Sequence, residues 1–336
     1  MSNKLFEESG YLSIPAILNY GLTFNWVCGA RGTGKTYGAL KDAVSAERKF
    51  ILMRRTQTQV DIISKNEFSP FKPLEVDGYG TFTTRKNSKY NSIVYHDDTP
   101  CATIAALSTF SNLRGFDASE IEELIFDEFI PEPHEKLIKN EAEAFANAYE
   151  TINRNRELKG SPPLKVLALA NSNRLDNEFF VFFNLVTTAY RMIETGQSIY
   201  IDRKRSIGLF MPNNSPISSA KEQTALYKAV SGGSSFYSMA IGNEFQTADR
   251  ELVCSLPLKE FISLVTVGEL TVWKHKSGDY YYVCEKRGGN PPIFSADSEN
   301  LKRFRTLYPF LALAHIERKI FFEKYYDKIL FEKYQK

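Results

Sequence analysis

Cysteine is scarce in this chain of 336 residues: there are four, and no two of them form a C-x-x-C pair. Structural zinc sites and disulfide frameworks depend on closely spaced or regularly paired cysteines, so the sequence indicates neither. The spacing fits a protein that works in a reducing compartment. The four positions are Cys28, Cys101, Cys254 and Cys284.

Long apolar runs are absent as well. The N-terminus, Met1 to Leu5, lacks the hydrophobic stretch of a signal peptide. No uninterrupted apolar run approaches the ~20 residues that span a bilayer. These two absences favour a soluble, intracellular protein without a membrane partner.

An excess of charge of one sign is also missing, since 42 Lys and Arg stand against 40 Asp and Glu, a formal net charge of +2. This balance neither indicates nor excludes nucleic acid as a partner. Basic residues do gather beyond Leu301, where nine Lys and Arg face four Asp and Glu among regularly spaced aromatics. We expect one or two amphipathic helices there, with a buried aromatic stripe; a phosphate-binding role for the basic face is the alternative.

Against these absences stands one complete motif, the G-x-x-x-x-G-K-[ST] phosphate-binding loop at residues 29–36. An apolar run at 24–28 precedes it and a helix-compatible segment at 37–44 follows, which is the strand, loop and helix order that the motif needs. Backbone N–H groups of such a loop converge on phosphate oxygens, while Lys35 would reach the β and γ phosphates and the Thr36 hydroxyl would hold Mg²⁺. The predicted nucleotide-binding residues are Gly29, Ala30, Arg31, Gly32, Thr33, Gly34, Lys35 and Thr36.

A second nucleotide motif ends an apolar run at residues 124–128. An Asp at the end of a buried strand is suited to order the Mg²⁺ shell, and an adjacent Glu can polarise the attacking water. We therefore predict Asp127 as the metal carboxylate and Glu128 as the catalytic base. Asn171 closes the apolar run at 166–170, where it could hydrogen-bond the γ-phosphate or the lytic water, or alternatively cap the following turn.

A guanine nucleotide is the less favoured ligand. Residues 173–176 resemble the guanine-reading N-K-x-D motif, but Arg174 replaces its lysine, and residues 127–130 lack the glycine of a D-x-x-G switch. That glycine hands a backbone N–H to the γ-phosphate in switch GTPases. The sequence thus predicts ATP and Mg²⁺ as the cofactors.

Apolar runs alternate with helical patterns from about residue 22 to 189, which is typical of an α/β fold with a mostly parallel sheet flanked by helices. Together with the two nucleotide motifs, this predicts an ASCE-type P-loop NTPase. We expect an exposed hairpin at 78–96 and a long helix at 135–157. The pattern divides the chain into a P-loop ATPase domain at 1–205, a linker subdomain at 206–249 and a smaller α+β domain at 250–336, which begins with a hairpin over 261–284. The predicted strands are 24–28, 50–54, 102–107, 124–126 and 166–170.

In several segments the chain resembles the DNA encapsidation, or genome-packaging, ATPases of small podoviruses whose genomes carry terminal proteins. The similarity spans most of residues 22–190 in the same order and spacing. The matching segments are 29–35, 53–55, 125–129, 154–157 and 180–186. The resemblance implies an ATP-driven motor subunit that moves double-stranded genomic DNA through the portal into a preformed capsid.

The same resemblance implies an assembly. Subunits would form a homomeric ring, expected to be a pentamer, attached transiently to the portal vertex of the procapsid in the host cell cytoplasm, with a structural packaging RNA as an additional candidate partner. Each ATP would lie between two subunits, and Arg154 would be the trans-acting arginine finger, with Arg156 as the alternative. Arg114 falls where the family has a basic lid residue. The C-terminal domain would dock nucleic acid or capsid and resemble an RNase H-like nuclease without its metal site.

Two other classes stay open. Another ring-forming P-loop DNA translocase or helicase would share both motifs, and a P-loop nucleotide kinase would consume ATP only with a small-molecule acceptor. A packaging motor must accept every DNA sequence, so we expect Lys and Arg to grip phosphates instead of bases. The basic tip at residues 85–90 is a candidate for this contact, and a solvated turn is its alternative.

Overall fold

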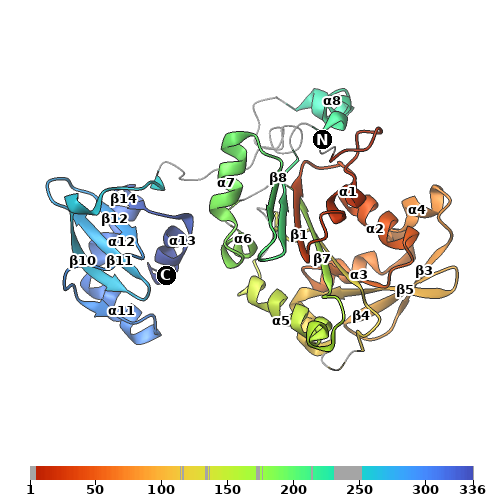
Figure 1. Cartoon of the computed structure of the whole chain (residues 1–336), viewed down its shortest axis with the longest axis horizontal. Coiled ribbons are helices and arrows are strands. Elements are labelled where there is room, and N and C mark those ends of the chain that lie inside the picture. Colours follow the sequence, from red (N-terminus) through yellow and green to blue (C-terminus); the bar gives the residue numbers. More distant parts are fainter. Residues whose placement is uncertain are drawn as a thin grey trace. The chain divides into compact units, whose positions relative to one another are not determined.

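A computed structural model describes residues 5–113, 115, 117–132, 135, 137–171, 175, 177–212, 215–230 and 252–335. The chain divides into two compact units (Figure 1). Unit 1 comprises Met1–Phe182 and Thr188–Gln246, and unit 2 comprises Phe183–Thr187 and Thr247–Lys336. No helix among the described residues is both long enough and apolar enough to cross a bilayer.

Unit 1 is built on a nine-stranded sheet with the order β3-β4-β5-β2-β6-β7-β1-β9-β8. The six strands from β5 to β9 in this order run parallel, and antiparallel strands flank them at both edges. The bounds are β1 Phe24–Gly29, β2 Phe50–Arg54, β3 Phe82–Lys86, β4 Asn91–His96, β5 Thr99–Ala106, β6 Glu123–Asp127, β7 Lys165–Asn171, β8 Ile199–Asp202 and β9 Ile207–Phe210.

The five predicted strands are confirmed to within three residues at their ends. They are β1, β2, β5, β6 and β7, whose side chains are mostly buried on both faces of the sheet, apart from the first three residues of β5. Central parallel strands read as continuous apolar runs for this reason. The predicted hairpin at 78–96 is also present, as the antiparallel pair β3 and β4 at the edge of the same sheet.

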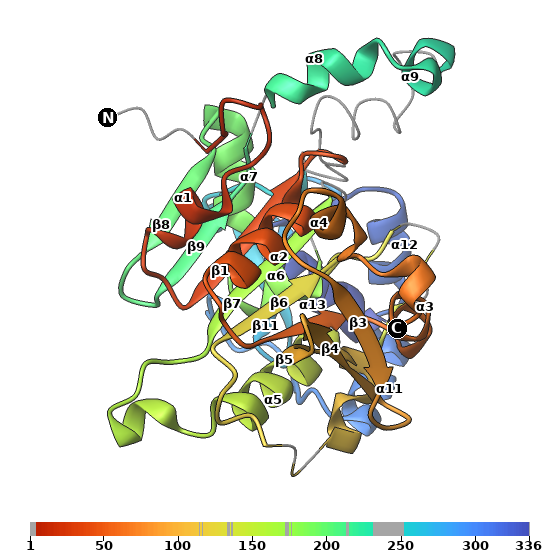
Figure 2. The ribbon, with the colours of Figure 1, turned by 90° about the vertical axis from the view of Figure 1, so that its right-hand side faces the viewer.

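Helices cover both faces of this sheet (Figures 1 and 2). On one face Val27 and Leu52 share a buried cluster with Leu40 and Ala43 of α2. On the other face Trp26 lies against the rings of α5 and α6, with centroids 5.8 Å from Phe145 and 5.8 Å from Phe179. The bounds are α1 Ile14–Leu18, α2 Lys35–Ser45, α3 Gln57–Ile63, α4 Lys72–Val76, α5 Glu141–Asn153, α6 Glu178–Phe182, α7 Val186–Thr195, α8 Pro216–Glu222 and α9 Ala225–Ala229.

The predicted helix at 135–157 is too long at both ends. Helix α5 begins after Asn140, whose φ is 53°, and ends at Arg154 and Asn155, whose φ values are 47° and 56°. Two successive residues in the left-handed region cannot continue a right-handed helix, and Asn favours that region more than most residues. The helix therefore stops before the Arg-Asn-Arg segment instead of including it.

The predicted domain boundary at residue 205 is also corrected, because it cuts through the β8–β9 hairpin. Strand β9 pairs in parallel with β1, with Phe24 opposite Ile207, so the sheet that carries the phosphate loop continues past 205. Gly208 fits this close pairing, since a Cβ there would lie 2.6 Å from Phe210 and 2.9 Å from Leu22. In the predicted linker, α8 and α9 are described, whereas residues 231–249 lie outside the described residues.

Unit 2 has a five-stranded sheet with the order β13-β10-β11-β12-β14. Strands β10, β11 and β12 form the predicted hairpin and one further antiparallel strand, while β13 and β14 pair in parallel at the two edges. The bounds are β10 Phe261–Val267, β11 Leu270–His275, β12 Tyr281–Cys284, β13 Ile293–Phe294, β14 Ile320–Phe322, α11 Ser298–Leu307, α12 Pro309–Ile316 and α13 Tyr325–Gln335.

The expectation of one or two helices beyond residue 301 is therefore incomplete. Three helices are present, and the strand β14 lies between α12 and α13, with Phe322 fully buried in it. Phe304 and Phe331 are buried as the aromatic stripe predicts.

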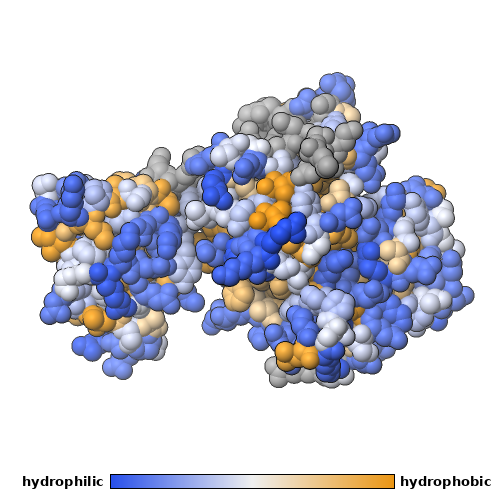
Figure 3. Space-filling view, viewed as in Figure 1, coloured by the Kyte–Doolittle hydropathy of each residue, from blue (hydrophilic) through white to orange (hydrophobic). Residues whose placement is uncertain are grey.

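Hydrophilic residues dominate the visible surface of the described parts, and the apolar residues there form scattered patches (Figure 3).

Candidate nucleotide-binding site

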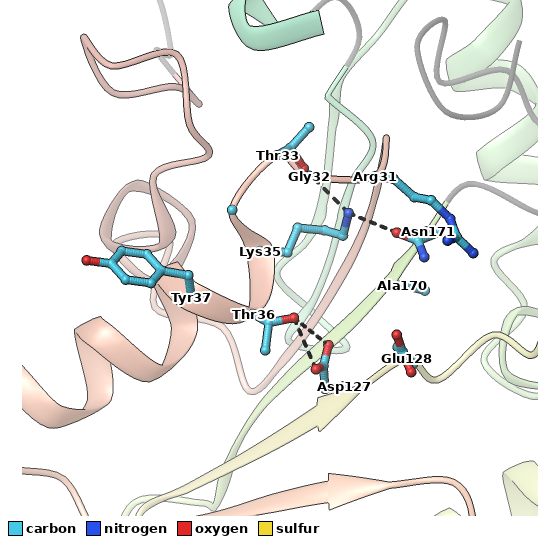
Figure 4. Close-up of a pocket in the computed structure, with 11 residues that line it drawn as sticks. Arg31, Gly32, Thr33, Lys35, Thr36, Tyr37, Asp127, Glu128, Ala170 and Asn171 are labelled. Carbon is cyan, nitrogen blue, oxygen red and sulfur yellow. Dashed lines mark hydrogen bonds between the residues drawn. The ribbon is translucent and has the colours of Figure 1, made fainter. Parts of the chain in front are cut away.

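The phosphate loop joins β1 to α2 and surrounds a cavity of about 380 Å³ (Figure 4). Gly32 and Gly34 have φ values of +69° and +80°, a backbone conformation that favours glycine. Helix α2 begins at Lys35, directly after this turn. The loop thus points the N-terminus of an 11-residue helix at the cavity, where N–H groups and the helix dipole favour an anion.

The cavity lies at the carboxyl ends of three neighbouring parallel strands. Strand β7 is hydrogen-bonded to β1 on one side and to β6 on the other, with Gly29 opposite Asn171. The Thr36 hydroxyl contacts both carboxylate oxygens of Asp127 at 3.0 Å. A hydroxyl and a carboxylate are the oxygen ligands with which P-loop NTPases hold Mg²⁺, so this donor set fits that ion.

Lys35, directly before Thr36, also lines the cavity. Its Nζ donates to the carbonyl oxygens of Gly29 at 3.0 Å and Ala30 at 2.8 Å, and to Oδ1 of Asn171 at 3.4 Å. Burial lowers the pKa of Lys35 to about 8, although the Asp127 carboxylate acts in the opposite direction. The ammonium is therefore held in place, ready to contact a phosphate next to the loop.

Glu128 follows Asp127 into the cavity in a left-handed conformation, with φ 57°. Burial raises the pKa of its carboxyl, while the nearby Arg54 lowers it. Arg54 closes β2 and bridges the two acids, with its guanidinium 2.7 Å from Oδ2 of Asp127 and 2.5 Å from Oε2 of Glu128. A cation between the two carboxylates offsets their mutual repulsion and orients Glu128.

The amide of Asn171 lies inside the site. Its Oδ1 accepts from Lys35, and its Nδ2 donates to Oε1 of Glu132 at 3.3 Å. The same carboxyl oxygen of Glu132 receives the guanidinium of Arg31 at 2.6 Å. Asn171 therefore links the ammonium of the phosphate loop to an acidic side chain on the segment that follows β6.

Three further side chains at the site were not predicted: Arg54, Glu132 and Lys221. Lys221 of α8 donates to the backbone oxygen of Arg31 and lies 3.3 Å from the position of a Cβ on Gly32. These three side chains are difficult to predict, because each reaches the site only through tertiary folding. For Arg54 the available signals were its position at the end of an apolar strand and the family resemblance at residues 53–55.

A sequence profile of the podovirus DNA encapsidation protein family matches residues 6–288 of the chain. This chain belongs to that family. Among its relatives, the DNA packaging protein of Bacillus phage phi29 is 24% identical over 244 residues, which cover 71% of this chain and 67% of the relative. The DNA packaging protein of Bacillus phage B103 is 25% identical over 234 residues, 68% of this chain and 66% of the relative.

Solved structures share the fold of this encapsidation-family chain. A chain of the bacteriophage phi29 viral genome packaging motor assembly matches with a TM-score of 0.70 at 18% identity, over 97% of this chain and 99% of that chain. A chain of the Phi-28 gp11 DNA packaging motor matches with a TM-score of 0.64 at 16% identity, over 97% and 96%. At these identities the likeness establishes the fold.

Arg154 and Arg156 of this family member do not line the cavity. They follow α5, where Oδ1 of Asn153 accepts from the backbone N–H of Leu164 at 2.8 Å, just before β7 begins. Arg156 donates to the carbonyl oxygen of Ala118 at 2.7 Å, ahead of β6. Both arginines therefore lie at the amino edge of the sheet, opposite the nucleotide cavity of the same subunit. Arg154 is exposed to solvent.

The remaining sequence predictions concern other parts of the chain. Arg114 and residues 173, 174 and 176 lie outside the described residues. At the 85–90 tip, Arg85 lies over the ring of Tyr95, 4.4 Å from its centroid. In unit 2, Asp279 pairs with Lys319 at 2.8 Å and Glu269 accepts from the Tyr326 hydroxyl at 3.3 Å. The nuclease-like and DNA-contact assignments stay predictions.

Proposed function

We propose that the chain is the ATP-hydrolysing subunit of a motor that drives double-stranded DNA through a portal into a phage capsid. The observation that carries this proposal is the 3.0 Å contact of Thr36 with Asp127, beside Lys35, in a member of the DNA encapsidation family. Two relatives of the chain, from phages phi29 and B103, are DNA packaging proteins, which supports DNA packaging as the process that ATP hydrolysis drives. Both known motifs of a P-loop ATPase thus meet at one cavity.

We assign each residue the role that its position supports. The loop amides and the Lys35 ammonium bind and orient the triphosphate. Thr36 and Asp127 would hold Mg²⁺, which neutralises charge on the β and γ phosphates when it is bound. Glu128 accepts a proton from the attacking water, Arg54 keeps the Glu128 carboxylate aimed at the cavity, and Asn171 is placed to hydrogen-bond the γ-phosphate.

In this proposal a neighbouring subunit completes the site with one further cation. An arginine finger donated by a neighbour is typically worth ~10³ to 10⁵ in rate. Arg154 is exposed at the opposite sheet edge, so a ring would bring it to the next subunit's cavity. We propose a homomeric ring, pentameric in the simplest case, that docks on the portal vertex of the procapsid in the host cell.

Protection of DNA from nuclease tests the motor function directly. Full-length chain, purified empty procapsids of the same phage, linear duplex DNA and ATP are mixed, and DNase is then added. The proposal predicts ATP-dependent survival of full-length DNA, and its loss with Lys35→Ala. DNA that stays fully sensitive while the protein hydrolyses ATP at the capsid would contradict the packaging role.

Mixing of inactive subunits tests the shared site. Rings of only Glu128→Gln or only Arg154→Ala subunits should hydrolyse ATP poorly, whereas mixed rings should regain part of the activity at junctions that carry both intact residues. Arg156→Ala is the matched control, because that guanidinium already bonds the carbonyl of Ala118. Rings of only Arg156→Ala subunits should therefore stay active; if they are inactive while rings of only Arg154→Ala subunits hydrolyse ATP, the finger is the other arginine.

A further inference from the structure

A second cavity, of about 560 Å³, lies against the phosphate loop and is lined by a different set of side chains. It shares Gly32, Gly34 and Tyr37 with the nucleotide cavity, so the two spaces meet at the loop. Tyr37 points away from Lys35, Asp127 and Asn171 (Figure 4). The remaining lining residues are Glu7, Ser9, Tyr11, Leu12, Gly38, Lys41, Pro73 and Asp77.

One wall of this cavity is a short hairpin near the N-terminus, in which Phe6 pairs with Leu12. The hairpin is fastened to the phosphate loop, since the Leu12 N–H donates to the carbonyl oxygen of Thr33 at 3.0 Å. Leu12 is buried, but Tyr11 beside it keeps 45% of its surface exposed. A large aromatic ring is therefore held at the rim of the loop with an open face.

The contact between this ring and the loop is close. A Cβ on Gly34 would lie 2.9 Å from Cδ1 of Tyr11, so the ring covers the glycine directly. The second aromatic wall is Tyr37, whose hydroxyl donates to the carboxylate of Asp77 and is thereby fixed. Two restrained tyrosines at a mainly apolar cavity are the usual means of binding a flat ring by stacking.

The orientation of the bound triphosphate determines which part of the nucleotide would reach the second cavity. Asp127, Glu128 and Asn171 mark the end of the nucleotide cavity at which the γ-phosphate is cleaved. Since the phosphate chain passes through the loop, the α-phosphate leaves on the opposite side, past the start of α2. Tyr37 and Gly38 belong to that first turn of α2, and both line the second cavity.

We propose that this second cavity binds the adenosine of ATP, with the base stacked on Tyr11 and the side chain of Tyr37 forming the wall next to the α-phosphate. The inference rests on the proposed ATPase function, because it assigns the second half of the same ligand. The N-terminal hairpin is then part of the nucleotide site, although it carries no recognisable motif. Truncation of the chain before the phosphate loop would remove it.

Calorimetric titration of the full-length chain with two ligands tests this assignment. Mg-ATP reports the whole nucleotide, and Mg-tripolyphosphate reports the phosphate half alone. Tyr11→Ala is expected to weaken ATP binding about tenfold or more and to leave tripolyphosphate binding within about twofold, since stacking on an aromatic side chain is lost. Tyr11→Phe keeps the ring and should bind ATP within about threefold of the native chain.

Several results would overturn the inference. Tyr11→Ala with unchanged ATP affinity, or with equal losses for both ligands, would show that the ring does not hold the base. A native chain that binds tripolyphosphate as tightly as ATP would exclude a base site of any kind. A native chain that binds neither ligand would refute the ATPase proposal itself, which separates that failure from this one. Thermal unfolding of each variant confirms that it is folded.

Discussion

Arg55 tests how much a buried ion pair contributes to the stability of unit 1. It follows Arg54 at the end of β2, but its side chain turns into the protein and is only 1% exposed. Its Nε lies 2.6 Å from Oε1 of Glu141, at the start of α5, and its Nη1 lies 3.0 Å from Oε2 of Glu135. The Glu141 side chain is 4% exposed, so Arg55→Ala leaves a carboxylate buried without its cation.

Removal of one partner from a buried ion pair typically costs about 3–5 kcal/mol, mostly as the penalty for the charge left behind. In a domain of the size of unit 1, each kcal/mol lowers the unfolding temperature by about 2–4 °C. We therefore expect Arg55→Ala to lower it by about 6–20 °C in differential scanning calorimetry. Substitution of both partners by apolar residues, Arg55→Met with Glu141→Leu, should recover most of the loss.

The matched control is Lys49→Ala, which breaks the pair of Lys49 with Glu120. These side chains are 43% and 73% exposed, and exposed pairs contribute at most about 1 kcal/mol. The reasoning is refuted if Arg55→Ala and Lys49→Ala shift the unfolding temperature equally, or if the double variant is less stable than Arg55→Ala alone.

Three further predictions concern titrating groups. Burial lowers the pKa of Lys35 to about 8. The affinity for ATP, measured by calorimetry, should therefore fall about tenfold per pH unit above pH 8.5 as the ammonium is lost. An affinity that stays constant up to pH 9.5 would contradict this prediction. Burial raises the pKa of Glu128, and a general base must be ionised to accept a proton. Phosphate release should therefore slow as the pH falls toward that pKa. Glu128→Gln should reduce kcat at least about 100-fold. Burial, with Glu285 nearby, raises the pKa of Asp327 to about 7 from the ordinary 3.8. The folded state therefore takes up a proton below pH 7 that the unfolded chain does not, and unit 2 should unfold several degrees higher at pH 5 than at pH 8. Asp327→Asn should remove this difference in calorimetry, and an unchanged difference would refute the assignment.

The centre of the fold could be predicted because each of its parts is local in the sequence. Strands β1, β2, β6 and β7 are buried on both faces and appear as apolar runs, and the phosphate loop is a contiguous motif. Asp127 was predictable for the same reason, as an acid at the end of such a run. The alternation of strands and helices then places these strand ends at one edge of a parallel sheet.

The parts that could not be predicted depend on contacts between distant residues. Strand β9 has four residues, one of them Gly208, and it is identified by its pairing with β1 and β8. The bridge from Arg54 to Glu128 spans 74 positions and joins the ends of two strands. The end of α5 is decided by the left-handed backbone of Arg154 and Asn155.

The central claim is that the phosphate loop and the Asp127–Glu128 pair act on one nucleotide. A structure of the full-length chain with Mg²⁺ and a nonhydrolysable ATP analogue tests it most directly. The account predicts the β and γ phosphates within the loop of residues 29–36, contacted by Lys35, with the metal between Thr36 and Asp127. Phosphates bound away from that loop, or a metal that Asp127 does not approach, would contradict it.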